Sequence, residues 1–284
     1  MTPIRTHACD CHMHIYDRRF PAAAGARLLP PDAPVPEYRK LQARLGLERT
    51  VVVTPSTYGT DNASLFDALE QLGTAARGVA VLDAAVSDDE LQRLHAAGVR
   101  GIRFNQTLSD ITPIETLELL AARIHPLGWH VQVLLKPDDI PLLESRLRRL
   151  PVPVVFDHLG RLPPAGMAHP AFRSIMNLID CGKVWVKLSG AYLCGRRAGD
   201  DYPDATPLAH AYLAAAPERM VWGSNWPHPS ASAGIHEWPD DAALLDLLAR
   251  WTDDPRLFSR VLVDNPAVLY DFPSSERKEM HSCK

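Results

Sequence analysis

Short hydrophobic runs alternate with amphipathic stretches along this chain. The hydrophobic runs are rich in β-branched residues and short enough for buried strands. We expect eight strands, over residues 7–15, 49–56, 77–83, 99–105, 130–135, 153–160, 183–190 and 219–225. In the stretches between them, apolar residues recur every three or four positions, as on one face of a helix, and several of these stretches end in glycine. The pattern therefore alternates strand and helix.

Repeated strand–helix units predict an α/β fold, a closed (β/α)8 TIM barrel, which usually has about 250 residues. An open doubly wound sheet is the alternative, but no glycine-rich phosphate-binding turn follows the first run. Because no linker or short repeat interrupts the pattern, we expect one domain over residues 1–272, closing with helices near 243–251 and 255–272. The polar segment 273–284 is expected to be a disordered tail.

Composition narrows the class of partner. The chain has 284 residues, a net charge of -4 and 46% hydrophobic residues, which indicates a soluble protein with a substantial core. No basic surface is expected, so neither nucleic acid nor membrane is a predicted partner, and a small molecule is favoured. No apolar run approaches ~20 residues and no signal-peptide pattern opens the chain, so we expect a cytoplasmic protein. Its five cysteines form no disulfide framework.

The first run carries the strongest chemical signal. In a barrel of this kind, active-site side chains lie at the carboxyl ends of the strands. Strict alternation divides the run into one face with Asp10, His12 and His14 and another with Cys9, Cys11, Met13 and Ile15. We expect the polar face to look into the barrel. A His-x-His pair can converge on a metal ion, and a hydrogen-bonded core histidine is the alternative.

Two later runs end in basic side chains. Arg103 and Asn105 share one face at the end of the fourth run, and a guanidinium there predicts an anionic substrate. A salt bridge to a neighbouring loop is the alternative for Arg103. The sixth run ends in His158, expected to face the same way as Val154 and Phe156, and Arg161 follows it.

Hydroxyl groups gather near other strand ends. The loop after the second run contains Ser56, Thr57 and Tyr58 and is suited to a polyhydroxylated ligand. The seventh run carries Lys187 and Ser189, and Tyr192 follows. Together with the arginines, these side chains predict a wet, cationic pocket.

The eighth run leads into "VWGSNWPHP", residues 221–229, which places Asn225 at the strand end and His228 in the turn. An amide can orient a group by hydrogen bonding, but it cannot take a proton at neutral pH. Asn225 is therefore not a general base.

Several of these motifs occur in one order, with His12 and His14 first, "DHLGR" at 157–161 next and "WGSNWPHP" at 222–229 last. In this the chain resembles the amidohydrolase superfamily, and most closely its 2-pyrone-4,6-dicarboxylate lactonase-like branch, to which a D-galactarolactone isomerase also belongs. The resemblance extends from about residue 7 to residue 272 and includes "TPSTYGTDN", "RGIRFN", "GWHVQV" and "VKLSGAY". It implies a barrel enzyme that acts on an anionic lactone.

The resemblance also bears on metal binding. Metal-dependent members of the superfamily use the two first-strand histidines, a fifth-strand His or carboxylated Lys, a sixth-strand His and an eighth-strand Asp. Here His130 lies at the wrong end of the fifth run, Gln132 lies within that run, and Asn225 replaces the Asp. We therefore expect no cofactor, with zinc held by His12, His14 and His158 as the alternative.

The same resemblance implies the reaction. In the lactonase the eighth-strand Asp activates water, whereas in the isomerase the substrate's own hydroxyl attacks and converts D-galactaro-1,5-lactone to D-galactaro-1,4-lactone. An internal hydroxyl can reach an effective molarity on the order of 10⁵ M. Because position 225 holds an amide, we expect the isomerase. One alternative is a sugar-acid or pyrone-dicarboxylate lactone hydrolase that uses a histidine as base. The other is a catalytically silent barrel that binds sugar acids.

In this hypothesis three histidines, His12, His14 and His158, donate hydrogen bonds to the lactone carbonyl, each worth about 3 kcal/mol. The substrate carboxylate is held by Arg103 with Arg161 or Lys187. Asn225 and His228 position the attacking hydroxyl. The remaining predicted substrate contacts are Ser56, Tyr58, Asn105, Gln132, Ser189 and Tyr192.

Overall fold

Eight parallel strands form the centre of the protein in a computed structural model that describes residues 6–107, 111–197 and 201–273. The strands are β1 (Cys9–Met13), β2 (Arg49–Val53), β3 (Ala76–Ala80), β4 (Val99–Asn105), β5 (His130–Leu134), β6 (Val154–Phe156), β7 (Val184–Ser189) and β8 (Met220–Gly223). Each pairs with the next along the chain. Backbone hydrogen bonds of 2.8 Å from His14 to Trp226 and from Asn225 to His12 join the first and last strands. The predicted (β/α)8 barrel is confirmed.

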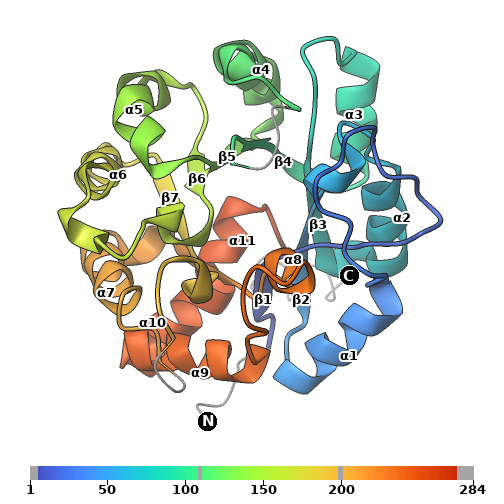
Figure 1. Cartoon of the computed structure of the whole chain (residues 1–284). Coiled ribbons are helices and arrows are strands. Elements are labelled where there is room, and N and C mark those ends of the chain that lie inside the picture. Colours follow the sequence, from blue (N-terminus) through green and yellow to red (C-terminus); the bar gives the residue numbers. More distant parts are fainter. Residues whose placement is uncertain (1–5, 108–110, 198–200, 274–284) are drawn as a thin grey trace, which may run out of the picture.

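Helices surround the strands in a ring (Figure 1). The connecting helices are α1 (Val35–Leu45), α2 (Ala63–Leu72), α3 (Asp88–Ala96), α4 (Leu117–Ile124), α5 (Ile140–Arg149), α6 (Pro170–Asp180) and α7 (Thr206–Ala215). After β8 come α8 (Pro229–Ser232), α9 (Asp241–Thr252), α10 (Pro255–Ser259), a π-helical turn (Arg260–Asp264) and α11 (Asn265–Leu269). None of these helices within the described ranges is long and apolar enough to span a bilayer. Residues 274–284 of the expected tail lie outside the described residues.

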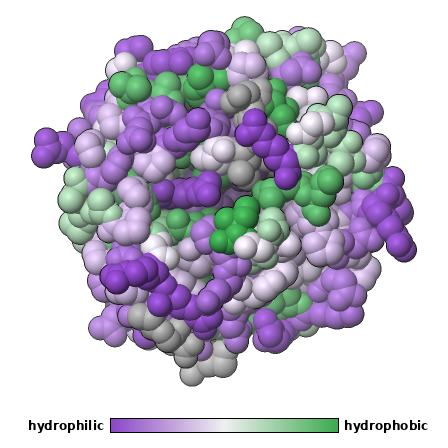
Figure 2. Space-filling model, viewed as in Figure 1, coloured by the Kyte–Doolittle hydropathy of each residue, from purple (hydrophilic) through white to green (hydrophobic). Residues whose placement is uncertain are grey.

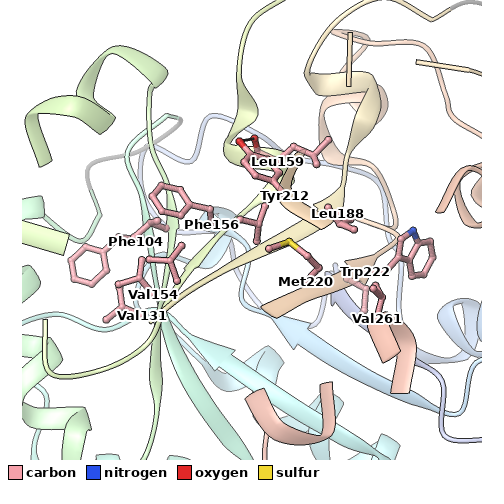
Figure 3. Close-up of a cluster of buried hydrophobic side chains, with 14 of the residues drawn as sticks. Phe104, Val131, Val154, Phe156, Leu159, Leu188, Tyr212, Met220, Trp222 and Val261 are labelled. Atoms are coloured by element: carbon pink, nitrogen blue, oxygen red, sulfur yellow. Dashed lines mark hydrogen bonds between the residues drawn. The ribbon is translucent and has the colours of Figure 1, made fainter. Parts of the chain in front are cut away.

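Apolar side chains pack on both sides of the sheet. Inside the barrel, five valines from four strands form one cluster with two cysteines of β1, namely Val51, Val53, Val79, Val155 and Val221 with Cys9 and Cys11. Outside, strand residues such as Phe104, Val131 and Leu188 pack against the helices (Figure 3). Burying each large apolar side chain contributes about 1.5 to 3 kcal/mol. These two layers leave the carboxyl ends of the strands as the place where polar groups gather.

The first strand departs from strict alternation. The register between β1 and β2 shifts between Asp10 and Met13, as in a β-bulge, which adds a residue to one strand and reverses the facing of the residues after it. Cys9 and Cys11 pack with the inward-facing valines, so our assignment of the inward face to Asp10 was wrong. His12 and His14, beyond the shift, still reach the carboxyl end of the barrel.

Asp10 instead ties the first strand to the last. Its carboxylate accepts hydrogen bonds from the backbone N–H of Ser224 at 2.9 Å and from the Ser224 hydroxyl at 2.6 Å. The hydroxyl of Tyr38, on α1, donates to the same carboxylate at 3.2 Å. Burial raises the pKa of Asp10 to about 6, against the opposing effect of these hydrogen bonds. This contact fixes where His12 and Asn225 lie relative to each other.

The sixth strand is shorter than expected. It ends at Phe156, and His158 lies in the following turn with a φ of 52°. Val154 and Phe156 pack in the outer layer (Figure 3), so the expectation that His158 faces the same way was wrong. The left-handed turn, and not strand alternation, directs His158 toward the barrel mouth.

Closure of the barrel depends on Gly223. A Cβ there would lie 2.5 Å from the Cβ of His12 and 2.7 Å from its backbone nitrogen. We expect Gly223→Ala to lower the free energy of unfolding by about 3 kcal/mol, because β1 and β8 must move apart. Gly182→Ala is the control, since its Cβ would meet nothing within 4 Å and only its φ of 80° is strained. Urea unfolding of that variant should show a free energy of unfolding lower by about 1 kcal/mol. Equal losses in the two variants would contradict the clash at Gly223.

Candidate active site

A pocket lies over the carboxyl ends of the strands and contains about 630 Å³ of space, part of it open to solvent. Figure 2 shows a hollow near the centre of this face, with hydrophobic residues beside hydrophilic ones. Its polar lining includes His14, Ser56, Arg103, Asn105, His158, Arg161 and Asn225. Its apolar lining includes Leu28, Pro55, Leu134, Leu193 and Ile235. The lining contains two guanidinium groups and, among the described residues, no carboxylate.

The carboxylate of Asp157 is buried and contacts Arg103, which lines the pocket. Its Oδ2 accepts hydrogen bonds from Gln132 at 3.0 Å and from Nε of Arg103 at 3.3 Å. Burial alone would raise the pKa of Asp157, but His12, Lys187 and Arg103 outweigh burial and hold that pKa well below its usual range. Asp157 is therefore an anion within the barrel. Asp157 was not among our predicted site residues, although alternation from the inward Val155 points to it.

A buried ammonium accompanies this carboxylate. Nζ of Lys187 donates to Oε1 of Gln132 at 2.7 Å and to the carbonyl oxygen of Cys11 at 2.9 Å. Lys187 and Gln132 are both 0% exposed and do not line the pocket. The structure therefore does not bring these two predicted substrate contacts to the pocket surface.

Two of the three histidines that were expected to donate to the lactone carbonyl make hydrogen bonds to other groups. Nδ1 of His14 lies 2.8 Å from the carbonyl oxygen of Val53, which only accepts, so a neutral His14 carries its proton there. Burial lowers the pKa of His14 to about 3, so it is neutral at pH 7. Its Nε2 lies 3.3 Å from Nε2 of His12, which is 0% exposed. Neither ring has a proton to donate into the pocket.

His158 keeps one ring nitrogen for the pocket. Its Nδ1 lies 2.9 Å from the hydroxyl of Ser189, whereas Nε2 makes no hydrogen bond to the described chain. Burial lowers the pKa of His158 to about 3, so the ring is neutral. Positive φ angles at His158, Leu159 and Arg161 strain this turn, and such strain persists only where the surrounding structure holds it. The turn fixes one imidazole at the pocket wall.

A chain of hydrogen bonds runs away from Asn225. Nδ2 of Asn225 donates to the hydroxyl of Tyr192 at 2.7 Å, and that hydroxyl lies 3.1 Å from Nδ1 of His228. Nε2 of His228 lies 3.0 Å from a carboxylate oxygen of Asp241, on α9. With the carboxylate of Asp241 as acceptor, Nε2 of His228 donates to it, and Nδ1 of His228 accepts from the Tyr192 hydroxyl. Oδ1 of Asn225 then remains as an acceptor for the pocket.

Several predicted site residues therefore act behind the pocket wall. His12, Ser189, Tyr192 and His228 orient the groups in front of them and do not line the pocket themselves. Tyr58 does not line it either. Its hydroxyl accepts the backbone N–H of Asp17 at 2.8 Å.

The structure brings Ser56, Asn105, Arg103 and Arg161 together at the pocket, as expected. The hydroxyl of Ser56 accepts a hydrogen bond of 2.9 Å from the Asn105 amide. Tyr16 and Ser230 also line the pocket and were not predicted. Tyr16 lies in the loop after β1 and Ser230 in the short helix α8, and the sequence shows no pattern to distinguish either residue.

A metal site can be tested against the residues present. Among the described residues, His12, Asp157 and His158 place candidate ligand atoms within 4.8 Å of one another. Nζ of Lys187, however, lies 3.2 Å from Nδ1 of His12 and 3.7 Å from Oδ1 of Asp157. Two positive charges, on Lys187 and Arg103, thus already contact the one carboxylate, and position 225 supplies no further negative charge. This set does not fit a divalent cation.

The chain is similar to several known proteins over most of its length. Residues 9–272 match the family model described as amidohydrolase. A 2-pyrone-4,6-dicarboxylate hydrolase from Comamonas testosteroni is 37% identical, over 93% of this chain and 90% of the relative. A D-galactarolactone isomerase from Agrobacterium fabrum is 33% identical, over 93% and 90% of the two chains. A crystal structure from Agrobacterium tumefaciens has 30% identity and a TM-score of 0.86, covering 95% of this chain and 97% of the other.

The depressed pKa of Asp157 makes stability depend on pH. Folding favours its carboxylate, so this stabilisation is complete above about pH 4 and is lost as the pH falls further. We expect Asp157→Asn to lower the free energy of unfolding near neutral pH by about 3 to 5 kcal/mol, because Lys187 loses its counter-charge. The difference from wild type should shrink below about pH 4 in urea unfolding.

The control for this experiment is Asp138→Asn, at a side chain that is 93% exposed. It should change stability by less than about 0.5 kcal/mol at any pH. A loss at Asp157 that stays constant down to about pH 3 would contradict the depressed pKa.

Proposed function

Because this chain belongs to the amidohydrolase family, we propose that it is a lactone isomerase that converts D-galactaro-1,5-lactone to D-galactaro-1,4-lactone. The observation that carries the proposal is the wall of the pocket, where the end of β8 presents the amide of Asn225 and no carboxylate lines the described cavity. A water molecule there meets no strong base. A hydroxyl that belongs to the substrate needs less activation, because it is already held beside the carbonyl.

The charges of the pocket support an anionic lactone as substrate. Arg103 and Arg161 both line it, and guanidinium groups bind carboxylates through two parallel hydrogen bonds. Arg103 uses Nε on Asp157 and leaves its terminal nitrogens for the ligand. We infer that one arginine holds the free carboxylate and the other lies beside the lactone carbonyl.

The proposed reaction keeps every proton within the pocket. Oδ1 of Asn225 accepts a hydrogen bond from a neighbouring hydroxyl of the substrate. This contact directs the oxygen of the attacking hydroxyl toward the carbonyl carbon and its proton toward Nε2 of His158. As the new C–O bond forms, Nε2 of His158 takes the hydroxyl proton, and the arginines stabilise the oxyanion. The tetrahedral intermediate then breaks its original ring C–O bond, and His158 returns the proton to the departing ring oxygen. No water is consumed and no metal takes part.

A lactone hydrolase is the second candidate. The 37% identical relative is named as a pyrone-dicarboxylate hydrolase, and Leu28, Leu193 and Ile235 give the pocket an apolar side that suits a flat unsaturated ring. In that reaction Nε2 of His158 would take a proton from water instead. Since the pKa of His158 is lowered to about 3 by burial, it is a weak base in either reaction. We favour the isomerase because the substrate's own hydroxyl, already held beside the carbonyl, needs less activation than water.

Labelled water separates the two candidates. We expect D-galactaro-1,5-lactone incubated with the enzyme in ¹⁸O-water to give the 1,4-lactone without label at the carbonyl carbon, because the attacking oxygen comes from the substrate. Mass spectrometry and NMR of the products measure both label and ring size. If ¹⁸O enters the product at the rate of substrate loss and the product is an open diacid, the isomerase proposal is wrong.

Substitution of Asn225 tests whether its amide selects isomerisation over hydrolysis. Asn225→Asp places a carboxylate where the amide lies, so we expect hydrolysis to rise by roughly 100-fold over the wild-type background, the size of a typical general-base contribution. Formation of open diacid from the same lactone measures it. Asn225→Ala is the matched control, which removes the amide without adding a base and should lower isomerisation without raising hydrolysis. Hydrolysis unchanged in Asn225→Asp would mean that the amide does not select the reaction.

A further inference from the structure

Lys187 is an unusual residue for the interior of a barrel, because an ammonium is costly to bury without partners. It is 0% exposed, yet each of its three protons has an acceptor. These acceptors are Oε1 of Gln132 at 2.7 Å, the carbonyl oxygen of Cys11 at 2.9 Å and Nδ1 of His12 at 3.2 Å. Burial lowers the pKa of Lys187 to about 8, which leaves it charged at pH 7.

The contact between Lys187 and His12 determines which ring nitrogen of His12 carries its proton. Nδ1 of His12 faces both Lys187 and Oδ1 of Asp157, the latter at 3.1 Å. A proton on this Nδ1 would leave the unprotonated Nε2 atoms of His12 and His14 facing each other at 3.3 Å. A hydrogen bond from Lys187 to Nδ1 avoids this repulsion, because His12 then donates from Nε2 to His14. His14 in turn donates from Nδ1 to Val53.

The same ammonium neutralises Asp157. Oδ1 of this carboxylate accepts no hydrogen bond of good geometry, and Nζ of Lys187 lies 3.7 Å from it. A divalent ion held by His12, Asp157 and His158 would use this oxygen as its anionic ligand. It would then lie within a few ångströms of the ammonium and be repelled by it.

We infer that the ammonium of Lys187 is the resident cation of this site: it neutralises Asp157, sets the tautomer of His12 and excludes a divalent metal ion. Lys187 is thus a positioning residue that acts on the pocket through His12 and His14. This role is independent of which lactone the pocket binds.

Metal binding tests the exclusion directly. Zinc titrated into the wild-type protein against a chromophoric chelator should find no stoichiometric site. Lys187→Met keeps the length of the side chain and removes the charge, and we expect it to bind zinc roughly 100-fold more tightly than wild type. Lys183→Met is the control, because Lys183 lies just before the same strand and contacts the carbonyl oxygen of Leu150 at 3.4 Å. The double variant Lys187→Met/Asp157→Asn should lose this increase in zinc affinity.

Histidine tautomers give a second readout. Two-bond ¹H–¹⁵N spectra of the wild-type protein should show the proton of His12 on Nε2, and Lys187→Met should move it to Nδ1, where Asp157 accepts it. Circular dichroism verifies that the variant is folded. Stoichiometric zinc binding by wild type, or a wild-type His12 protonated on Nδ1, would overturn the inference even if the variant does not fold.

Discussion

The active site depends on one buried anion, Asp157. A carboxylate within a dry barrel must be neutralised locally, because an unpaired charge there costs several kcal/mol. Lys187, Arg103 and Gln132 all contact it or its partner, and each comes from a different strand. Their positions leave little freedom to the groups above them. The orientation of the pocket histidines is therefore set from below, by charge compensation, before any substrate arrives.

A second constraint comes from backbone geometry. The left-handed turn at His158 and the positive φ of Asn225, 63°, both occur in the lining of the pocket. Such conformations cost about 1 to 3 kcal/mol each. The hydrogen bond between the His158 ring and Ser189 and that from Asn225 to Tyr192 hold both side chains in place. Two rigid hydrogen-bond acceptors, Nε2 of His158 and Oδ1 of Asn225, then face a substrate that must be folded onto itself to react.

The sequence predicts the site well wherever a strand is regular. The register shift between β3 and β4 lies at the start of β4, between Val99 and Gly101, so alternation over the rest of the strand assigns Arg103 and Asn105 to the pocket correctly. Alternation fails in β1, because a register shift leaves no mark in the residue pattern, and after β6, because His158 lies in a turn. The same alternation, counted from Val155, would have assigned Asp157 to the inward face. Asp241 was not, since it lies in the first turn of a helix 13 residues after His228 and no local pattern links the two.

The contact between Asp10 and Ser224 joins residues 214 positions apart in the chain. Such distant pairing is slow to form, because the entropy of closing the loop must be overcome first. Synthesis runs from the amino terminus, so β1 leaves the ribosome long before β8 exists. His12 and Asn225 can face each other only after the last strand has been added. A nascent or truncated chain therefore has no active site, and catalytic activity reports that the whole barrel has closed.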